Sequence, residues 1–326
     1  MSPVAELSGA RSVMDTATLF SILRERDVKL WVEEDRLKCS APVGALDAEL
    51  RTTLASQKED ILAFLRRAEG KNGSTAIVPI KPGGSKRPIF AVSGHGGDVF
   101  YLLGLARHLD AEQPMLGVQP PGLDGSEPLK TVEALARYEI EQIRRYQARG
   151  PYLIAGHCAG GTIAFEVAQQ LTAAGQQVAL LALIGSAFPT MFRRRTFAWL
   201  RLRRYARALT SVSGFMSKLQ RRLHTPDALA GVNPAVLAAR RRVENATVAA
   251  VRRYKPRPYP GQIDLFITSD KWHQTHRWRA FGTAVREHRV GDFEIDDLLL
   301  GPDVTVLAAS LQDTLRMPSV DNLAQE

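Results

Sequence analysis

The chain has 326 residues, of which 45% are hydrophobic and 24% charged, values that exclude collagen, coiled coils and a wholly disordered polypeptide. Its 43 Lys and Arg residues exceed its 34 Asp and Glu residues and give a net charge of +9, which favours acidic partners. Two cysteines make no disulfide framework, residues 1–11 hold no apolar leader, and the longest apolar run, 178–188, is too short to span a bilayer. We therefore expect a cytoplasmic globular protein.

A small unit with the order α-ββ-α is predicted over residues 15–67. Apolar residues recur with helical spacing near its start and again after Asp47, a residue type that caps helices. Between these helices, residues 28–33 and 36–40 flank a polar pair and alternate as the strands of a hairpin do. A unit of this size buries little core alone, which favours a role in binding a partner.

Strands alternate with helices over residues 88–315, after a polar, glycine-containing linker predicted at 68–87. Helices of 10–17 residues between strands indicate an α/β fold, in which a parallel sheet is covered on both faces. A basic insertion at about 190–250 interrupts this pattern, and residues 316–326 form a tail. The expected strands lie at 89–93, 115–119, 152–156, 178–184, 263–268 and 287–290.

The motif GHCAGG at residues 156–161 stands between a predicted strand and a predicted helix. Small residues two positions before and after Cys158 allow the strand and the helix to approach closely, as a nucleophile elbow requires. The Ala159 amide at the start of the helix is then placed to bind an oxyanion, and the helix N-terminus is expected to lower the pKa of the thiol. The alternative is that Cys158 is a small buried core residue.

A second glycine-rich motif, GHGG at residues 94–97, follows the first strand of this region. Its backbone amides, those of His95 and Gly96 in particular, are candidates for the second half of an oxyanion hole. The alternative is a plain glycine turn. A phosphate-binding loop is excluded, since the sequence holds neither a Walker A motif nor a dinucleotide-binding motif with its downstream acid.

Together these motifs resemble the α/β-hydrolase thioesterase domains of nonribosomal peptide and polyketide assembly lines. The resemblance implies an α/β-hydrolase fold with a helical lid and a nucleophile at Cys158. It also implies an acyl or peptidyl carrier protein as partner, whose phosphopantetheine is the acyl donor; no bound cofactor or metal is predicted. The matching segments, in the family's order, are PIFAV at 88–92 with HGG, LGVQPPGL at 116–123, GPYLIAGHCAGG at 150–161 with AFEVA, and YKPRPYPG at 254–261.

Residues 15–67 resemble the TubC-type N-terminal docking domain of such systems, around VKLWV at 28–32 and LKCSAP at 37–42. In that family the module binds a short C-terminal segment of the upstream synthase subunit through an edge of its hairpin. Trp31 and Leu37 are the candidate docking residues, and a place in the hairpin core is compatible with that role.

Two positions depart from the thioesterase pattern. The family's acid follows the strand after the elbow helix, where this chain has Gly185. The family's histidine lies in a late Gly-Asp-His motif, where this chain has Phe293. Surrogate catalytic candidates are His95 beside the elbow, and Asp270 with His273 after a late strand.

A positioned base typically raises the rate of a step that needs proton transfer by about 100–10,000-fold. We therefore expect the loss of a strong base to slow attack by water more than attack by an amine or a thiol. A thiolate at Cys158 can accept an acyl group from a pantetheine thiol in a nearly isoenergetic exchange. The sequence therefore predicts acyl transfer or condensation rather than chain hydrolysis. Two alternatives stay open: a non-catalytic pseudo-thioesterase scaffold, and an ordinary type II editing thioesterase, which requires a histidine near Cys158.

Apolar and basic residues interleave in the insertion, and residues 191–222 hold ten Lys or Arg residues without an acid. At the family's lid position such residues would cover an acyl pocket and bind the acidic carrier or its phosphate. A solvated charged face and a membrane-surface helix are the alternatives. We predict no nucleic-acid or membrane partner, because no nucleic-acid-binding motif accompanies the charge. The candidate substrate- or carrier-binding residues are Phe192, Arg194, Phe197, Trp199 and Arg203.

Overall fold

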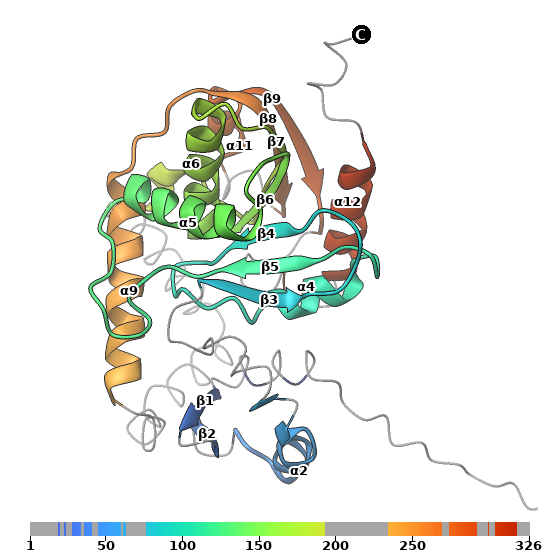
Figure 1. The fold of residues 1–326 in the computed structure, drawn as a ribbon, viewed down its shortest axis with the longest axis vertical. Helices are drawn as coiled ribbons and strands as arrows, with labels where there is room; N and C mark the ends of the chain where they lie inside the picture. Colours follow the sequence, from blue (N-terminus) through green and yellow to red (C-terminus); the bar gives the residue numbers. More distant parts are fainter. Residues whose placement is uncertain are drawn as a thin grey trace, which may run out of the picture.

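A seven-stranded sheet with the order β3-β5-β4-β6-β7-β8-β9 lies at the centre of the larger unit (Figure 1). The computed structural model describes residues 28–33, 36–40, 45–59, 61–62, 76–192, 234–268, 274–291 and 304–317, together with Leu19, Leu23 and Leu299. The strands are β3 Ile77–Lys81, β4 Ile89–Val92, β5 Met115–Val118, β6 Tyr152–His157, β7 Val178–Ile184, β8 Tyr259–Ile267 and β9 Gly282–Arg289.

Neighbouring strands of this sheet are parallel, except that β3 runs antiparallel to β5. The parallel sheet expected from the sequence is therefore confirmed. The strand β3 was not predicted, and it lies within residues 68–87, where we expected a linker. Because β3 occupies an edge of the sheet, Pro79 is tolerated there: one side of an edge strand needs no hydrogen-bond donor.

Helices cover both faces of the sheet, with α4 and α12 on one face and α5, α6 and α9 on the other. Thr131 Oγ1 accepts the Ala134 amide at 3.2 Å and caps α5. Within the described ranges, no helix combines the length and the apolar character needed to cross a bilayer. The bounds are α4 Leu102–His108, α5 Val132–Tyr146, α6 Ala159–Ala173, α9 Pro234–Arg253, α11 Thr275–Trp278 and α12 Val304–Arg316, with a 3₁₀ turn η1 at Pro189–Phe192.

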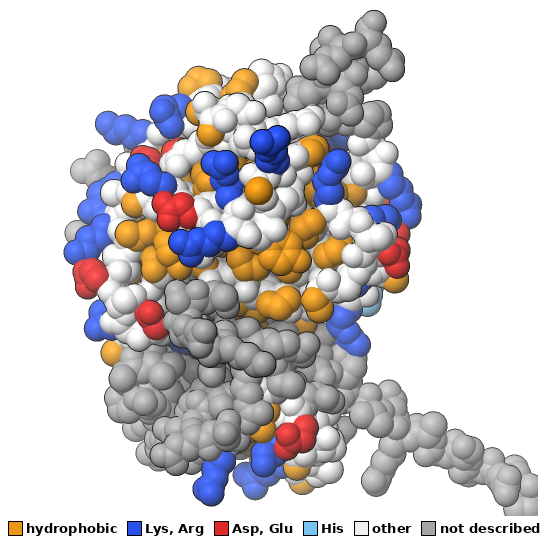
Figure 2. Space-filling view, in the orientation of Figure 1, with side chains coloured by type: hydrophobic (Ala, Val, Ile, Leu, Met, Phe, Trp, Pro, Cys, Tyr) orange, Lys and Arg blue, Asp and Glu red, His pale blue; other side chains and the backbone are white. Residues whose placement is uncertain are grey.

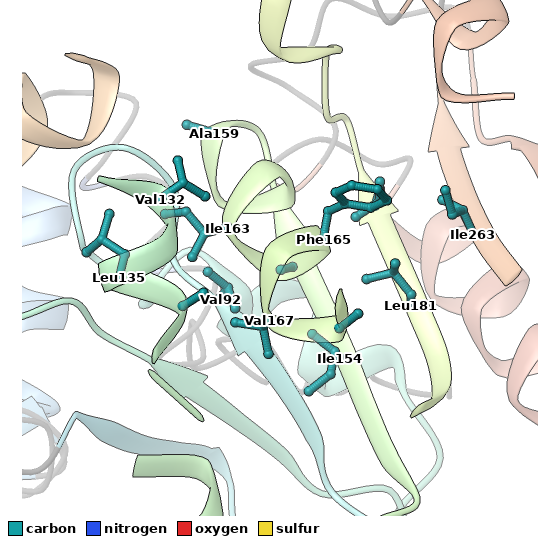
Figure 3. Packing of buried hydrophobic residues seen from close by; sticks show 14 of the residues in the cluster. Val92, Val132, Leu135, Ile154, Ala159, Ile163, Phe165, Val167, Leu181 and Ile263 are labelled. Atoms are coloured by element: carbon teal, nitrogen blue, oxygen red, sulfur yellow. The ribbon is translucent and has the colours of Figure 1, made fainter. Parts of the chain in front are cut away.

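The central strands are apolar on both sides, because helices bury both faces of the sheet. Ile154 of β6 belongs to the hydrophobic cluster shared with α5 and α6, whereas its neighbour Ala155 belongs to the cluster shared with α4 and α12. Figure 3 shows part of the first cluster, with Val132 of α5 and Ile163 of α6 among its side chains. This two-sided core fixes the position of the junction between β6 and α6.

The N-terminal unit has a small core of its own. Strands β1 Lys29–Glu33 and β2 Arg36–Ser40 form the predicted antiparallel hairpin, and helix α2 spans Ala48–Ser56. The Asp47 carboxylate accepts the Leu50 amide at 2.8 Å and caps α2, as expected. Phe100 of the larger unit packs against this core, whose buried residues are Leu19, Leu23, Val28, Leu50, Leu54 and Ile61.

Candidate active site

Cys158 lies at the junction of β6 and α6, at the carboxyl edge of the sheet. Its backbone has φ 54° and ψ −120°, a conformation that costs a non-glycine residue about 1–3 kcal/mol and is typical of a nucleophile elbow. The Cys158 amide donates to the Ile184 carbonyl at 3.1 Å, and the Cys158 carbonyl accepts the Gly161 amide at 3.2 Å, which fixes the turn. Cys158 forms no disulfide and is partly exposed, so it is not a fully buried core residue.

Glycines around Cys158 let the strand, the turn and the helix meet. A Cβ on Gly156 would lie 2.5 Å from the Gly160 carbonyl oxygen. A Cβ on Gly160 would collide with the Ser93 carbonyl oxygen, and Gly161 is confined just as closely. The small residues that the sequence analysis required on both sides of the elbow are therefore confirmed. The contact at Gly160 also shows that the loop after β4 lies directly against the elbow.

Two backbone amides of the loop after β4 are available as hydrogen-bond donors. The Gly94 amide donates to the Tyr101 hydroxyl at 3.0 Å, and the Gly97 amide donates to the Gly94 carbonyl at 3.1 Å. The amides of His95 and Gly96, which lie between them, have no acceptor within the described part of the chain. The two central amides of this loop therefore remain available to an acceptor from outside the described part of the chain.

A third donor is the first amide of α6. Ala159 follows Cys158 directly, and its N–H has no acceptor among the residues described. The first amides of a helix have no intrahelical carbonyl and carry the positive end of the helix dipole, so they attract an anion. A Cβ on Gly96 would meet no atom within 4 Å, so the space in front of that residue is open.

His95 is paired with a carboxylate from α9. Its Nε2 lies 3.7 Å from Glu244 Oε1, and the two side chains are 48% and 51% exposed. The helix comes near this edge of the sheet because Val243 packs on the loop after β5, where a Cβ on Gly122 would lie 3.0 Å from Val243 Cγ2. No signal in the sequence pointed to Glu244, which lies on α9 near the end of the insertion and far along the chain from His95.

Two further histidines are engaged elsewhere. The His157 ring packs against Tyr101 with a centroid distance of 5.1 Å. On β9, His288 Nε2 lies 2.9 Å from the buried Asp264 carboxylate of β8. Since β9 is three strands from β6, at about 4.8 Å per strand, His288 lies about 14 Å from the elbow strand. The pair of His288 and Asp264 therefore does not reach Cys158.

Gly185, at the position that the resemblance assigns to the family's acid, follows β7 directly. It lies beside the elbow, because its neighbour Ile184 accepts the Cys158 amide. This position carries no side chain and supplies no carboxylate. The other candidates for the acid and the histidine, Asp270, His273 and Phe293, lie outside the described residues.

The predicted binding residues fall mostly outside the described part of the chain. Phe192 ends η1, and its side chain is not among those described. Trp31 lies on β1, also without a described side chain, whereas Leu37 on β2 is partly buried against the N-terminal core. The remaining lid candidates, all outside the described residues, are Arg194, Phe197, Trp199 and Arg203.

A buried polar contact ties α6 to the end of α9. The Tyr254 hydroxyl donates to Glu166 Oε2 at 2.6 Å, and Glu166 is 1% exposed. Burial, reinforced by the hydrogen bond to the Glu166 carboxylate, raises the pKa of Tyr254. Arg257 lies 3.5 Å from the other oxygen of Glu166. Because α6 begins at the elbow and α9 carries Glu244, this contact helps to fix the distance between the two.

The fold and the elbow define an α/β-hydrolase: a parallel sheet covered on both faces, with a strained residue between the central strand and its helix. Residues 87–301 match the Thioesterase domain family, and residues 17–67 match the TubC N-terminal docking domain. Because the first match covers more than half of the chain, the protein belongs to the thioesterase family.

Relatives with related sequences are much longer proteins. The chain is 42% identical over 145 residues to Malpibaldin synthetase from Mortierella alpina. This match covers 43% of this chain and 3% of that protein. The chain is also 35% identical over 164 residues to Indigoidine synthase from Dickeya dadantii (strain 3937). This match covers 48% of this chain and 11% of that protein. The chain therefore spans only a small part of the length of these relatives.

Solved structures share the fold at low sequence identity. The NocB thioesterase domain, determined as a covalent complex with a fluorophosphonate nocardicin G analogue, is 20% identical with a TM-score of 0.57, over 74% of this chain and 100% of that chain. The four-domain nonribosomal peptide synthetase AB3403, bound to AMP and glycine, is 18% identical with a TM-score of 0.61, over 98% of this chain and 27% of that chain.

Proposed function

We propose that this protein is a chain-release acyltransferase of a nonribosomal peptide or polyketide assembly line. It takes an acyl group from the phosphopantetheine thioester of a carrier protein onto Cys158 and passes it to an amine or another nucleophile. The observation that carries this proposal is the elbow itself: a partly exposed thiol in a strained turn, with the unengaged amides of Ala159, His95 and Gly96 beside it. The relatives named as synthetases, and the thioesterase domains of similar fold, support the same assembly-line context.

The chemistry proceeds in two balanced steps. Cys158 loses its proton to solvent and its sulfur attacks the thioester carbonyl, while the oxyanion of the tetrahedral intermediate is held by backbone amides. The carbon–sulfur bond to pantetheine then breaks, and the pantetheine sulfur takes a proton from solvent. In the second step an amine attacks the Cys158 thioester, its nitrogen loses a proton, and the Cys158 thiol is released.

Among the residues that the structure describes, the position of the family's acid beside the elbow carries no carboxylate, which favours acyl transfer over hydrolysis. Gly185 replaces the acid of the family pattern, and the buried Asp264–His288 pair lies too far away to substitute for it. Water must lose a proton as it attacks, and a positioned base contributes about 100–10,000-fold to such a step. A neutral amine is a good nucleophile before it loses its proton, so it depends less on a base.

The partners follow from the two units. The docking domain at residues 17–67 would bind a C-terminal segment of an upstream synthase subunit, with Trp31 and Leu37 of its hairpin as the docking residues. An acidic carrier protein would meet a basic molecule of net charge +9. Figure 2 shows Lys and Arg side chains spread over one face of the larger unit. Lid residues such as Arg194 and Trp199 would contact the carrier or the acyl chain.

Product analysis tests the proposal. Purified protein is incubated with an acyl carrier protein thioester in the presence and absence of candidate amines, and the amide and the free acid are quantified. The proposal predicts amide as the main product and its loss in the Cys158→Ala variant. Free acid as the only product would show an editing hydrolase instead. No turnover and no Cys158 adduct would show a scaffold, and either result would overturn the proposal.

A further inference from the structure

Tyr101 lies where the loop after β4 meets the elbow strand. Its hydroxyl accepts the Gly94 amide at 3.0 Å, and its ring packs against the His157 ring with a centroid distance of 5.1 Å. Gly94 and His157 also lie close together, because a Cβ on Gly94 would be 3.9 Å from His157 Nδ1. Each of the three residues thus contacts the other two. Since His157 directly precedes Cys158, this cluster joins the loop to the elbow.

The Tyr101 hydroxyl takes the place of a strand partner at the end of β4. The paired residues of β4 and β6 end with Val92 and Gly156. The Ser93 amide still donates to a carbonyl of β5 at 3.1 Å, but the next amide, that of Gly94, donates to the Tyr101 side chain instead of to a strand. Tyr101 therefore holds the chain at the point where it leaves the sheet and enters the loop.

Tyr101 is itself fixed by the core. Its side chain is 8% exposed, and its neighbours Val99 and Leu102 are buried. Val99 packs so closely on β5 that a Cβ on Gly117 would lie 2.7 Å from Val99 Cβ. A side chain held by buried neighbours on both sides can position the backbone group that it binds. The place of the Gly94 amide is therefore set by the core and not by the exposed loop alone.

We infer that Tyr101 is a positioning residue: it holds the Gly94 amide beside the elbow and thereby sets the positions of the His95 and Gly96 amides that follow. The inference rests on the proposed function, in which those amides bind the oxyanion formed when Cys158 is acylated. Tyr101 acts through the loop and not on the reacting atoms. Removing one correctly placed oxyanion donor typically slows a reaction about 100–1,000-fold, so a partial displacement of this loop is measurable.

Tyr101→Phe tests the inference, because it keeps the ring against His157 and removes only the hydroxyl. Acylation of Cys158 by an S-acyl-pantetheine is followed by rapid quench and mass spectrometry over a range of substrate concentrations. We expect the maximal rate to fall about 10-fold or more while the half-saturating concentration stays unchanged, since the oxyanion forms only after the substrate has bound. A wild-type maximal rate, or a change confined to the half-saturating concentration, would overturn the inference.

Tyr152→Phe is the matched control. The Tyr152 hydroxyl also makes a hydrogen bond of 3.0 Å to the backbone, in this case to the Gln147 carbonyl, and its side chain is buried. Tyr152 begins β6 and Cys158 follows its end, so at about 3.3 Å per residue the two lie about 20 Å apart. We expect Tyr152→Phe to lower the thermal midpoint without slowing acylation. Equal slowing by both variants would show a general loss of stability and would overturn the inference.

Amide spectra separate this inference from the proposed function. In ¹H–¹⁵N spectra without substrate, Tyr101→Phe should shift the His95 and Gly96 amides, and Tyr152→Phe should not. If these shifts occur but the wild-type protein gains no acyl group, the proposed function fails and the hold of Tyr101 on the loop stands. If the wild type is acylated and Tyr101→Phe reacts as fast, or reacts slowly without these shifts, the inference fails and the proposed function stands.

Discussion

Gly160→Ala probes the contact that holds the loop after β4 against the elbow. The added Cβ would collide with the Ser93 carbonyl oxygen and lie 2.8 Å from the Val92 carbonyl oxygen. All these neighbours are backbone atoms, so no side chain can rotate away. Restoring ordinary contact distances near 3.5 Å requires the end of β4 to move by about 1 Å.

Two quantities should change by different amounts. Overpacking costs about 1–3 kcal/mol, and replacing glycine by alanine in a helix returns up to about 1 kcal/mol, so we expect a net loss of about 1–2 kcal/mol in the free energy of unfolding. The same shift moves the amides of His95 and Gly96 away from Ala159. A misplacement of about 1 Å in a reacting site typically costs about 100-fold in rate.

The assay combines urea unfolding with the rate of Cys158 acylation under conditions in which the variant is folded. Gly83→Ala is the matched control, because a Cβ there would meet no atom within 4 Å and the residue does not have positive φ. It should be neutral or slightly stabilising, by up to about 1 kcal/mol. A folded Gly160→Ala variant with wild-type acylation would refute the reasoning that the loop and the elbow form one site.

Tyr254→Phe should lower the free energy of unfolding by about 1–3 kcal/mol, because it leaves the buried Glu166 carboxylate without its hydroxyl donor. The exposed Tyr146→Phe, measured in the same urea titration, should change by less than about 0.5 kcal/mol, and equal effects would contradict the assignment. Burial raises the pKa of the Glu139 carboxyl well above its ordinary value of 4.5, so the folded protein keeps a proton that the unfolded chain loses as the pH rises. The free energy of unfolding should therefore fall as the pH rises above 4.5. Glu139→Gln should be more stable than the wild type at about pH 8 but not at about pH 4. The same difference in stability at both pH values would count against this account.

The elbow could be predicted from the sequence because its requirements are local. A strained residue at 158 needs small neighbours within a few positions, and Gly156 and Gly160 supply them in a strand–helix context. The same locality explains why the cap at Asp47 was predicted correctly. In each case the residues that form the sequence pattern lie within five positions of one another.

The elements that the sequence did not predict depend on tertiary placement. The strand β3 contains Pro79 and is short, features that argue against a strand until its position at the edge of the sheet is known. The start of α4 at Leu102 likewise depends on a local turn, in which the Asp98 carboxylate accepts the Phe100 amide. The approach of Glu244 to His95 arises from the packing of α9, which no local pattern encodes.

The most direct test of the central claim is the mass of the intact protein after exposure to an S-acyl-pantetheine, followed by peptide mapping of the adduct. The account predicts one acyl group, on the peptide that contains Cys158, in the wild type and in Cys39→Ser. It predicts no adduct in Cys158→Ala. An unmodified wild-type protein, or an acyl group on Cys39 alone, would contradict the assignment of Cys158 as the acyl-accepting residue.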